Sequence, residues 1–486
     1  MPQPLCAPYA PLAHVFALLR TLLDLGVDAE PLVTRAQLVN NRLTAKLGRQ
    51  LDEALMLASG CVPSWTTELP RTHWFLCSFD TRLLLFRSTA LGYARLLSRL
   101  REQDPADETL RALSRVPRQK VRIARDNILA SAVKVMELYA ADESVLEVEY
   151  FDEVGSGLGP TLEFYALVSR EFARADLNMW RAADTSTDHG TTYVHTAHGL
   201  FPGALPAERA ERKQVLTLFH AMGAFVAKSL LDSRIIDVRF SPHFLRAVRG
   251  EPIPLTLEAL SQIDPTVAHS LASVAQLPAS DVDALALDFT LPGAPHIELV
   301  EHGVERAVTA DNRDEYVALV LETTLHTGVA AQIEAFRRGF DRVIALEHLA
   351  VLQPDELAAI FGHGTEDWSA ETLRRAIVPD HGFSACSREV ADLIEILSTF
   401  SADDRRTFLQ WLTGSPRLPV GGFASLQPPL TVVRRQAESP LTPDDYLPSV
   451  MTCVNYLKLP CYSSRDTMRA RLETAMREGL TTFHLS

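Results

Sequence analysis

Two Leu-Pro steps, at Pro448 and Pro460, bracket a short apolar segment near the C-terminus. Proline fixes its own φ angle and biases the residue before it away from helix, so no helix is expected to run through this segment. Val454, Tyr456 and Leu457 between the prolines favour a strand. We therefore predict a turn, a short strand and a second turn.

Cys453 falls where the first of these turns enters the strand, a place where a side chain can stay accessible. A thiol is chemically useful when part of it is thiolate and a reactant can reach it. Most cysteines are instead small core residues. The spacing alone therefore leaves both a catalytic and a structural role open for Cys453.

The stretch Leu447–Tyr462, with a helix after it and Phe483 four residues from the end, resembles the C-terminal lobe of the HECT ubiquitin ligases. The segments Val154–Phe164 and Thr413–Phe423 resemble the same family. The resemblance covers nearly the whole chain and is strongest to the ubiquitin-fusion-degradation subclass, which includes the thyroid-receptor-interacting ligase.

The resemblance implies an α+β, bilobal domain preceded by a helical extension. Residues 1–116 would form the extension and 117–383 a mainly helical N-lobe, whose small subdomain, about 255–330, docks a ubiquitin-conjugating enzyme. Residues 384–486 would form a smaller α/β C-lobe with a short sheet. The polar, glycine-containing stretch 379–384 matches the hinge between the lobes.

The resemblance also implies a role for each residue of the catalytic motif. Cys453 would hold ubiquitin as a glycyl thioester, while Thr452 and Asn455 orient the thiol or hydrogen-bond the developing oxyanion. Phe483 would hold the lobe or the substrate during transfer, or else anchor the C-terminus. Many family members carry a histidine where this chain has Met451, so we expect no role for an imidazole adjacent to Cys453.

In the family, the helix that docks the conjugating enzyme matches residues 315–320, which assigns Tyr316, Leu319 and Val320 to this contact. Tyr316 and Val320 lie at i and i+4 and share one helical face. An exposed aromatic flanked by aliphatic side chains suits a small, transient interface. The alternative is that Tyr316 belongs to the core.

The function implied by the resemblance is that of a ubiquitin-protein ligase acting in proteasomal degradation. Ubiquitin, a ubiquitin-conjugating enzyme and protein substrates would be its partners. Two alternatives stay open from the residues alone. The chain could be a cysteine hydrolase acting on ubiquitin conjugates, which needs a histidine near Cys453, or a catalytically inactive binding scaffold.

The composition further limits the functions and cellular locations to expect. Acidic residues outnumber basic ones by 61 to 47, giving a net charge of −14, which argues against nucleic-acid binding. The six cysteines form no Cys-x-x-Cys pair, a pattern typical of a reducing compartment. The N-terminal residues show neither a signal-peptide pattern nor a membrane span. We expect a soluble protein of the cytoplasm or the nucleus.

Two motifs could suggest a dinucleotide site and a metal site, but neither has all the residues that such a site needs. Gly155, Gly157 and Gly159 follow a predicted strand, but Pro160 stands where a dinucleotide-binding fingerprint needs its third glycine. His189, His195 and His198 lack the cysteine or carboxylate partners of a metal site. We therefore expect no cofactor and no metal.

Periodicity gives a coarse secondary structure. Helices are predicted at 12–26, 35–58, 80–100, 121–140, 214–231, 252–277, 311–340 with a break near Gly328, 388–411 and 463–479. Strands are predicted at 145–151, 285–292, 297–299 and 430–434, and residues 60–70 are predicted to be a connection.

Overall fold

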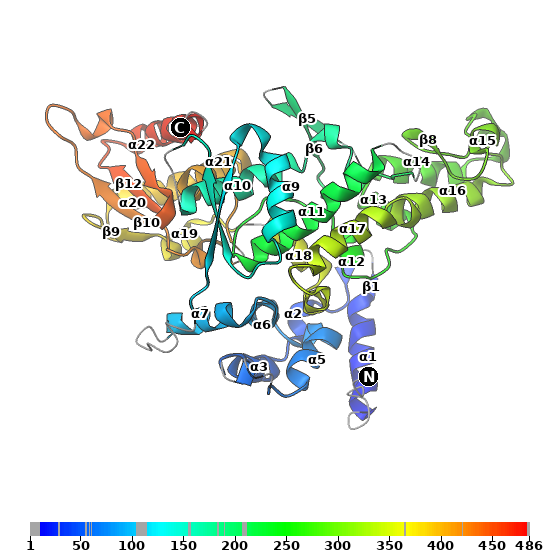
Figure 1. The fold of residues 1–486 in the computed structure, drawn as a ribbon, viewed down its shortest axis with the longest axis horizontal. Coiled ribbons are helices and arrows are strands. Elements are labelled where there is room, and N and C mark those ends of the chain that lie inside the picture. The colour runs from blue at the N-terminus through cyan, green and yellow to red at the C-terminus, as the bar shows by residue number, and fades with distance from the viewer. Residues whose placement is uncertain are drawn as a thin grey trace.

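The computed structural model of the chain describes residues 10–27, 30–53, 56–57, 59, 61–103, 114–153, 157–181, 184–188, 190–206, 211–363, 366–419 and 421–483. Its buried apolar side chains form two large clusters, which divide between Phe361 and Trp368. We call residues 10–103 the extension, 114–363 the N-lobe and 366–483 the C-lobe. In Figure 1 the C-lobe lies at one end, the small subdomain of the N-lobe at the other, and the extension beneath them. The fold is α+β and bilobal, as predicted.

The extension is a set of short helices with a small β1–β2 hairpin. Its elements are α1 (Ala10–Asp24), β1 (Gly26–Val27), β2 (Glu30–Pro31), α2 (Arg35–Leu38), α3 (Asn41–Leu51), α5 (Trp65–Thr72), η1 (Trp74–Leu76), α6 (Phe79–Ala90) and α7 (Tyr93–Gln103). The predicted connection at 60–70 is wrong in part, because α5 begins there and buries Thr66 and Pro70. The predicted helix at 80–100 is split at Gly92, whose φ of +83° favours glycine.

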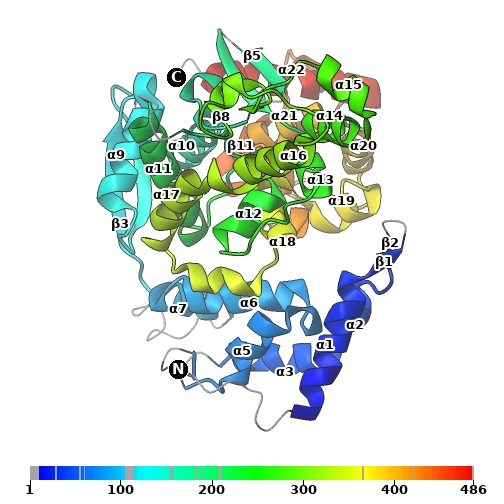
Figure 2. The same cartoon turned by 90° about the vertical axis from the view of Figure 1, so that its right-hand side faces the viewer.

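The extension shares its core with the N-lobe. Its buried Leu47, Leu85 and Phe86 belong to the same apolar cluster as the N-lobe helices. Figure 2 shows the extension running along one side of the N-lobe. Because the two parts bury one continuous core, they fold as one body.

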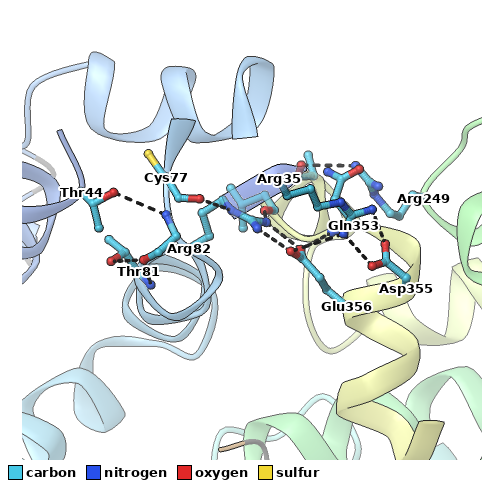
Figure 3. A network of polar contacts seen from close by, with 12 residues as sticks. Arg35, Thr44, Cys77, Thr81, Arg82, Arg249, Gln353, Asp355 and Glu356 are labelled. Atoms are coloured by element: carbon cyan, nitrogen blue, oxygen red, sulfur yellow. Dashed lines mark hydrogen bonds and ion pairs between the residues drawn. The ribbon is translucent and has the colours of Figure 1, made fainter. Parts of the chain in front are cut away.

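A buried polar network ties the same two parts together (Figure 3). Arg82 pairs with Glu356, and their side chains are 3% and 11% exposed. Arg82 also donates to the carbonyl oxygen of Val351 at 2.8 Å. On the outer side, Arg35 donates to both carboxylate oxygens of Asp355 at 2.6 and 3.0 Å. Asp355 and Glu356 lie on α18 (Pro354–Ala358), so the extension holds the last α-helix before the C-lobe.

The N-lobe begins with a strand that the sequence did not predict. Residues 121–140 were predicted to be one helix, but β3 (Arg118–Ile123) comes first and α9 (Ile128–Tyr139) follows. β3 pairs in parallel with β4 (Val145–Tyr150), the predicted strand. The remaining large elements are α10 (Leu158–Glu171), β5 (Asp184–Asp188), β6 (Thr191–His195), α11 (Arg212–Leu231), α12 (Pro242–Val248) and α17 (Ala330–Asp341).

Helices α11 and α17 cross at two glycines. A Cβ at Gly223 would lie 2.0 Å from the carbonyl oxygen of Phe336, and one at Gly339 would lie 1.9 Å from that of His220. Helix α11 is long and apolar enough to cross a membrane, but 72% of that window is buried inside the protein. We therefore regard α11 as the central core helix of the N-lobe.

The small subdomain forms the distal part of the N-lobe. It contains α13 (Leu257–Ser261), α14 (Pro265–Gln276), α15 (Ala279–Ala284), β7 (Thr290–Leu291), β8 (Ala294–Glu298), α16 (Arg313–Glu322) and a π-helical turn, Thr323–Thr327. The predicted helix break near Gly328 is confirmed. So is the predicted Pro-Gly turn between the two short strands, with Gly293 at φ +79°.

The C-lobe is a four-stranded sheet covered by helices. The strand order is β11-β12-β10-β9, with β10 parallel to both of its neighbours and β11 antiparallel to β12. Its elements are α19 (Ala370–Ala376), β9 (Val378–Asp380), α20 (Arg388–Ser398), α21 (Ala402–Thr413), β10 (Thr431–Arg435), β11 (Ser449–Met451), β12 (Tyr456–Pro460) and α22 (Arg465–Phe483).

The predicted hinge at 379–384 is wrong. Pro379 and Asp380 are part of β9, which pairs with β10 inside the C-lobe sheet. Trp368 and Leu373, before that strand, are already buried in the C-lobe core. The predicted lobe boundary at 383/384 therefore falls inside the C-lobe, and the connection between the lobes lies between Phe361 and Trp368.

Candidate active site

The turn that carries Cys453 joins two neighbouring strands of the C-lobe sheet. β11 and β12 pair antiparallel with Met451 opposite Tyr456. Thr452–Val454 form a single 3-10 turn between them, so the backbone of Cys453 lies on a turn that leads into a strand, as predicted. Because β11 is an edge strand, this turn lies at the border of the sheet.

Asn455 fixes the shape of this turn. It adopts the left-handed conformation, with φ 51° and ψ 41°, which asparagine tolerates better than most residues. Its side-chain nitrogen donates to the carbonyl oxygen of Pro428 at 2.6 Å, and its own carbonyl oxygen accepts from the amide of Thr431 at 3.0 Å. Asn455 is only 7% exposed. Asn455 therefore positions the turn. The two roles predicted for it, orienting the thiol and hydrogen-bonding the developing oxyanion, stay predictions.

Segments that lie far apart in the chain converge on a cleft of about 1320 Å³ beside this turn. Thr452 and Asn455 line it from the turn. Gly157 and Leu158 line it from the glycine-rich segment of the N-lobe, and Ser415 lines it from the Thr413–Phe423 segment. Helix α10 and the Cys453 turn are in direct contact across the lobes. The motifs that carry the resemblance thus surround one space.

The glycine-rich segment serves packing within the N-lobe. Gly157 has φ +93° and precedes α10, while Gly155 lies outside the described residues. The hydroxyl of Thr161 accepts from the amide of Val148 at 2.9 Å and donates to the carbonyl oxygen of Gly157 at 2.8 Å. These bonds hold the start of α10 against β4 and bring the helix to the Cys453 turn.

An ion-pair cluster joins the two lobes close to their connection. Asp237 of the N-lobe pairs with Arg406 of α21 and accepts from Nε of Arg417 at 2.9 Å. The neighbouring Val238 donates to the carbonyl oxygen of Phe361 at 3.0 Å. Burial alone would raise the pKa of the Asp237 carboxyl, but the two guanidinium groups outweigh it and lower that pKa. Asp237 is therefore charged at neutral pH and holds the C-lobe in the observed pose.

Four other cysteines lie in the part of the chain that the structure describes. Burial raises the pKa of the Cys77 thiol to about 11, so it is a core side chain. Desolvation also raises the pKa of Cys461, directly after β12. Cys61 and Cys386 are exposed, but neither lines the cleft.

Comparison with known proteins decides the family. Residues 166–486 match the HECT-domain (ubiquitin-transferase) family. The chain belongs to the HECT family. It is 45% identical over 464 residues to a probable ubiquitin fusion degradation protein of Schizosaccharomyces pombe, covering 92% of this chain and 28% of that protein.

Two further relatives agree. Ubiquitin fusion degradation protein 4 of Saccharomyces cerevisiae is 42% identical over 503 residues, covering 98% of this chain and 33% of that protein. The E3 ubiquitin-protein ligase TRIP12 of Danio rerio is 40% identical over 496 residues, covering 94% of this chain and 24% of that protein. This HECT chain spans about a quarter to a third of the length of these relatives. Its extension falls within the matched region, because the matches cover nearly the whole chain.

The prediction that Tyr316 is an exposed aromatic on α16 of this HECT domain is wrong. Tyr316 is 3% exposed and stacks edge-to-face on Phe289 with ring centroids 5.7 Å apart. Val320, one turn later on the same face, is fully buried. This stripe faces inward, because Tyr316 packs on Phe289 and α16 lies against α14. Of the three predicted contacts only Leu319 is half-buried, and it also packs in part against the N-lobe core.

The C-terminal helix of the HECT domain is longer than predicted. Gly479 was expected to end it, but α22 continues through Phe483. A Cβ at Gly479 would lie 2.4 Å from Cδ1 of Trp411, so this glycine permits close packing of α22 on α21. The side chain of Phe483 lies outside the described residues, and its predicted role stays a prediction.

The histidine-rich loop offers no metal site among the residues that the structure describes. His195 is exposed and lies 2.6 Å from the hydroxyl of Ser186 across the β5–β6 hairpin. His198 is also exposed, and His189 lies outside the described residues.

Proposed function

We propose that this chain is a ubiquitin ligase that takes ubiquitin from a conjugating enzyme onto Cys453 and passes it to lysine amines of a protein substrate. The single observation that carries the proposal is the convergence of the three family segments on one cleft beside the Cys453 turn. Substrates marked for degradation, including ubiquitin fusions, follow from the names of the relatives. We place this activity in the cytoplasm or the nucleus.

The first step exchanges one thioester for another. The Cys453 thiolate attacks the ubiquitin thioester of the conjugating enzyme, a new C–S bond forms, and the conjugating enzyme's cysteine leaves as thiolate. In the second step a lysine amine attacks the Cys453 thioester. A C–N bond forms, the C–S bond breaks, and the nitrogen releases one proton. This is covalent catalysis, which divides one difficult transfer into two easier ones.

Thioester exchange and aminolysis depend on alignment more than on a strong base. Holding the two reactants in place can lower a barrier by about 7–11 kcal/mol. Asn455 contributes by fixing the turn, and Thr452 contributes by lining the cleft that the acceptor would enter. Separate lobe cores support two poses, one for each step, with the Asp237 cluster holding one of them.

Conjugating-enzyme docking would use the outer face of α16. Ala318 is exposed there. Leu319 is half-buried at the edge of that face and packs in part against the N-lobe core, whereas Tyr316 belongs to the core. We expect Leu319→Ala to slow charging of Cys453 without lowering the free energy of unfolding by more than about 1 kcal/mol. Tyr316→Ala should instead destabilise the small subdomain, which thermal unfolding would report. Normal charging of the Leu319→Ala variant would remove this docking site.

The test is reconstitution with ubiquitin, ATP, activating enzyme and conjugating enzyme. We expect a ubiquitin adduct that is cleaved by thiol reductant and is lost in Cys453→Ala. Cys461→Ala is the matched control, because Cys461 lies in the same lobe and should leave the adduct intact. We expect Phe483→Ala to keep the adduct and to slow its transfer to lysine. Hydrolysis of ubiquitin chains without ATP would instead indicate a cysteine hydrolase, and an intact adduct in Cys453→Ala would overturn the proposal.

A further inference from the structure

The cleft beside the Cys453 turn is larger than a small-molecule site. Its volume of about 1320 Å³ exceeds the roughly 300–1,000 Å³ of pockets that hold small ligands. Its walls come from all three parts of the molecule: Arg87 of the extension, Arg234 of the N-lobe and Thr452 of the C-lobe are among the lining residues. A space of this size, with the turn on its wall, suits a polypeptide segment.

Among the described residues, the cleft carries positive charge that no acidic side chain neutralises. Arg87, Arg115 and Arg234 line it, and none of them has an acidic partner among the described residues. Nε of Arg234 is buried and has no hydrogen-bond partner within the described part of the chain. Two arginines of the same cleft are neutralised, in contrast. Arg95 pairs with Asp232 at 3.0 Å and Arg118 pairs with Glu147 at 3.3 Å.

The charge of these arginines is opposite in sign to the net charge of the chain. The chain has a net charge of −14, which by itself disfavours the approach of an acidic ligand. Complementary charge on one wall raises the rate of encounter and fixes the register of a bound segment. Guanidinium groups also bind carboxylates in a planar, bidentate geometry.

We propose that this cleft binds the acceptor, specifically an acidic segment that carries or flanks the lysine to be modified. The inference rests on the proposed function. The donor ubiquitin is held by its bond to Cys453, so the attacking amine has to arrive through open space beside the turn. Arg87 and Arg115 bind the aspartate or glutamate side chains of the acceptor, and its lysine then reaches the thioester near Thr452. The arginines are specificity-determining residues that do not touch the reacting atoms.

The experiment is a single-turnover discharge assay on the full chain charged with ubiquitin. The acceptors are two peptides with one lysine each, one flanked by Asp and Glu and the other by Asn and Gln at the same positions. Free lysine gives the rate without any flanking residues. We expect wild type to discharge onto the acidic peptide roughly fivefold faster at low salt, with the preference shrinking as salt screens exposed charges.

Three variants make the test specific. The double glutamine variant, Arg87→Gln with Arg115→Gln, should remove the preference for the acidic peptide and leave the rate of discharge onto free lysine unchanged. Arg87→Lys with Arg115→Lys keeps the charge and should retain most of the preference. Arg374→Gln is the matched control, because Arg374 is exposed on α19 and does not line the cleft.

Equal rates for both peptides in wild type would overturn the inference, as would an undiminished preference in the double glutamine variant. An equal loss with free lysine would also overturn it, because the arginines would then serve folding or transfer itself. Charging of Cys453 is measured first in every variant. Failure to charge wild type would overturn the proposed function, whereas normal charging without a peptide preference would overturn only this inference.

Discussion

The N-lobe meets the extension and the C-lobe through two different kinds of contact. Towards the extension, the N-lobe shares a continuous apolar core and buries the Arg82–Glu356 pair. Towards the C-lobe, the two apolar cores are separate, and the Asp237 cluster joins them next to the connecting segment. The first contact makes one rigid body. The second can be broken and remade at the cost of a few polar interactions, as a two-step transfer requires.

The largest effect is expected at the contact with the extension. Glu356→Gln leaves Arg82 charged, nearly buried and without its carboxylate, which should lower the free energy of unfolding by about 3–5 kcal/mol. Urea denaturation followed by tryptophan fluorescence would measure it. The extension and the N-lobe should lose structure together. Independent unfolding of the extension would contradict a shared body.

The crossing of α11 and α17 at Gly223 and Gly339 offers a second test, within the core that the extension and the N-lobe share. Gly223→Ala places a methyl group against the carbonyl of Phe336, which we expect to cost about 3 kcal/mol because two backbones have to separate. Gly48→Ala is the control, since a Cβ there meets nothing within 4 Å and alanine favours helix. Differential scanning calorimetry should show a lower Tm for the first variant and an equal or higher Tm for the second.

Weakening the contact between the lobes should change the relative position of the lobes more than it changes the free energy of unfolding. Asp237→Asn removes the charge that Arg406 and Arg417 share, and should weaken lobe docking by about 2 kcal/mol. Fluorophores on the exposed Cys61 and Cys386, with Cys6 and Cys453 replaced by alanine, would report the change as altered energy transfer. An unchanged transfer efficiency would show that this cluster does not set the pose.

The same contact should depend on pH with a defined sign. The pKa of Asp237 is lower in the folded protein than its ordinary value of about 3.9, so the stabilisation is fully present above that value. It should be lost only as pH falls through the lowered pKa. Energy transfer between the same labels should therefore stay constant from neutral pH down to about 4. A change between pH 5 and 7 would assign lobe docking to another group.

The smallest effect is expected at the outer edge of the contact with the extension. Arg35→Gln removes a pair whose side chains are 47% and 54% exposed, and water screens such pairs, so the loss should stay below about 1 kcal/mol. The urea midpoint of this variant, compared with Glu356→Gln, separates the exposed part of the network from its buried part. Equal losses would mean that Arg35 also supports packing on Trp74.

Patterns local in sequence predicted much of the fold. The two prolines around Cys453 predicted its turn, and periodicity predicted α11 nearly to its ends, whereas the helix predicted at 388–411 is two helices, α20 and α21. Contacts between distant residues were not predictable in this way. The pairing of β9 with β10 moved the lobe boundary, and Asp237 meets Arg417 across 180 residues of sequence. Tyr316 shows the same limit, because the resemblance assigned it to a docking helix, whereas its burial depends on contacts with distant residues such as Phe289.

The most direct test of the account is to locate the ubiquitin. Charged protein is quenched at low pH, digested under non-reducing conditions and analysed by mass spectrometry for the peptide that bears the glycyl remnant. We predict the remnant on Cys453 alone among the six cysteines. A remnant on Cys386 or Cys461, or charged protein with unmodified Cys453, would contradict it.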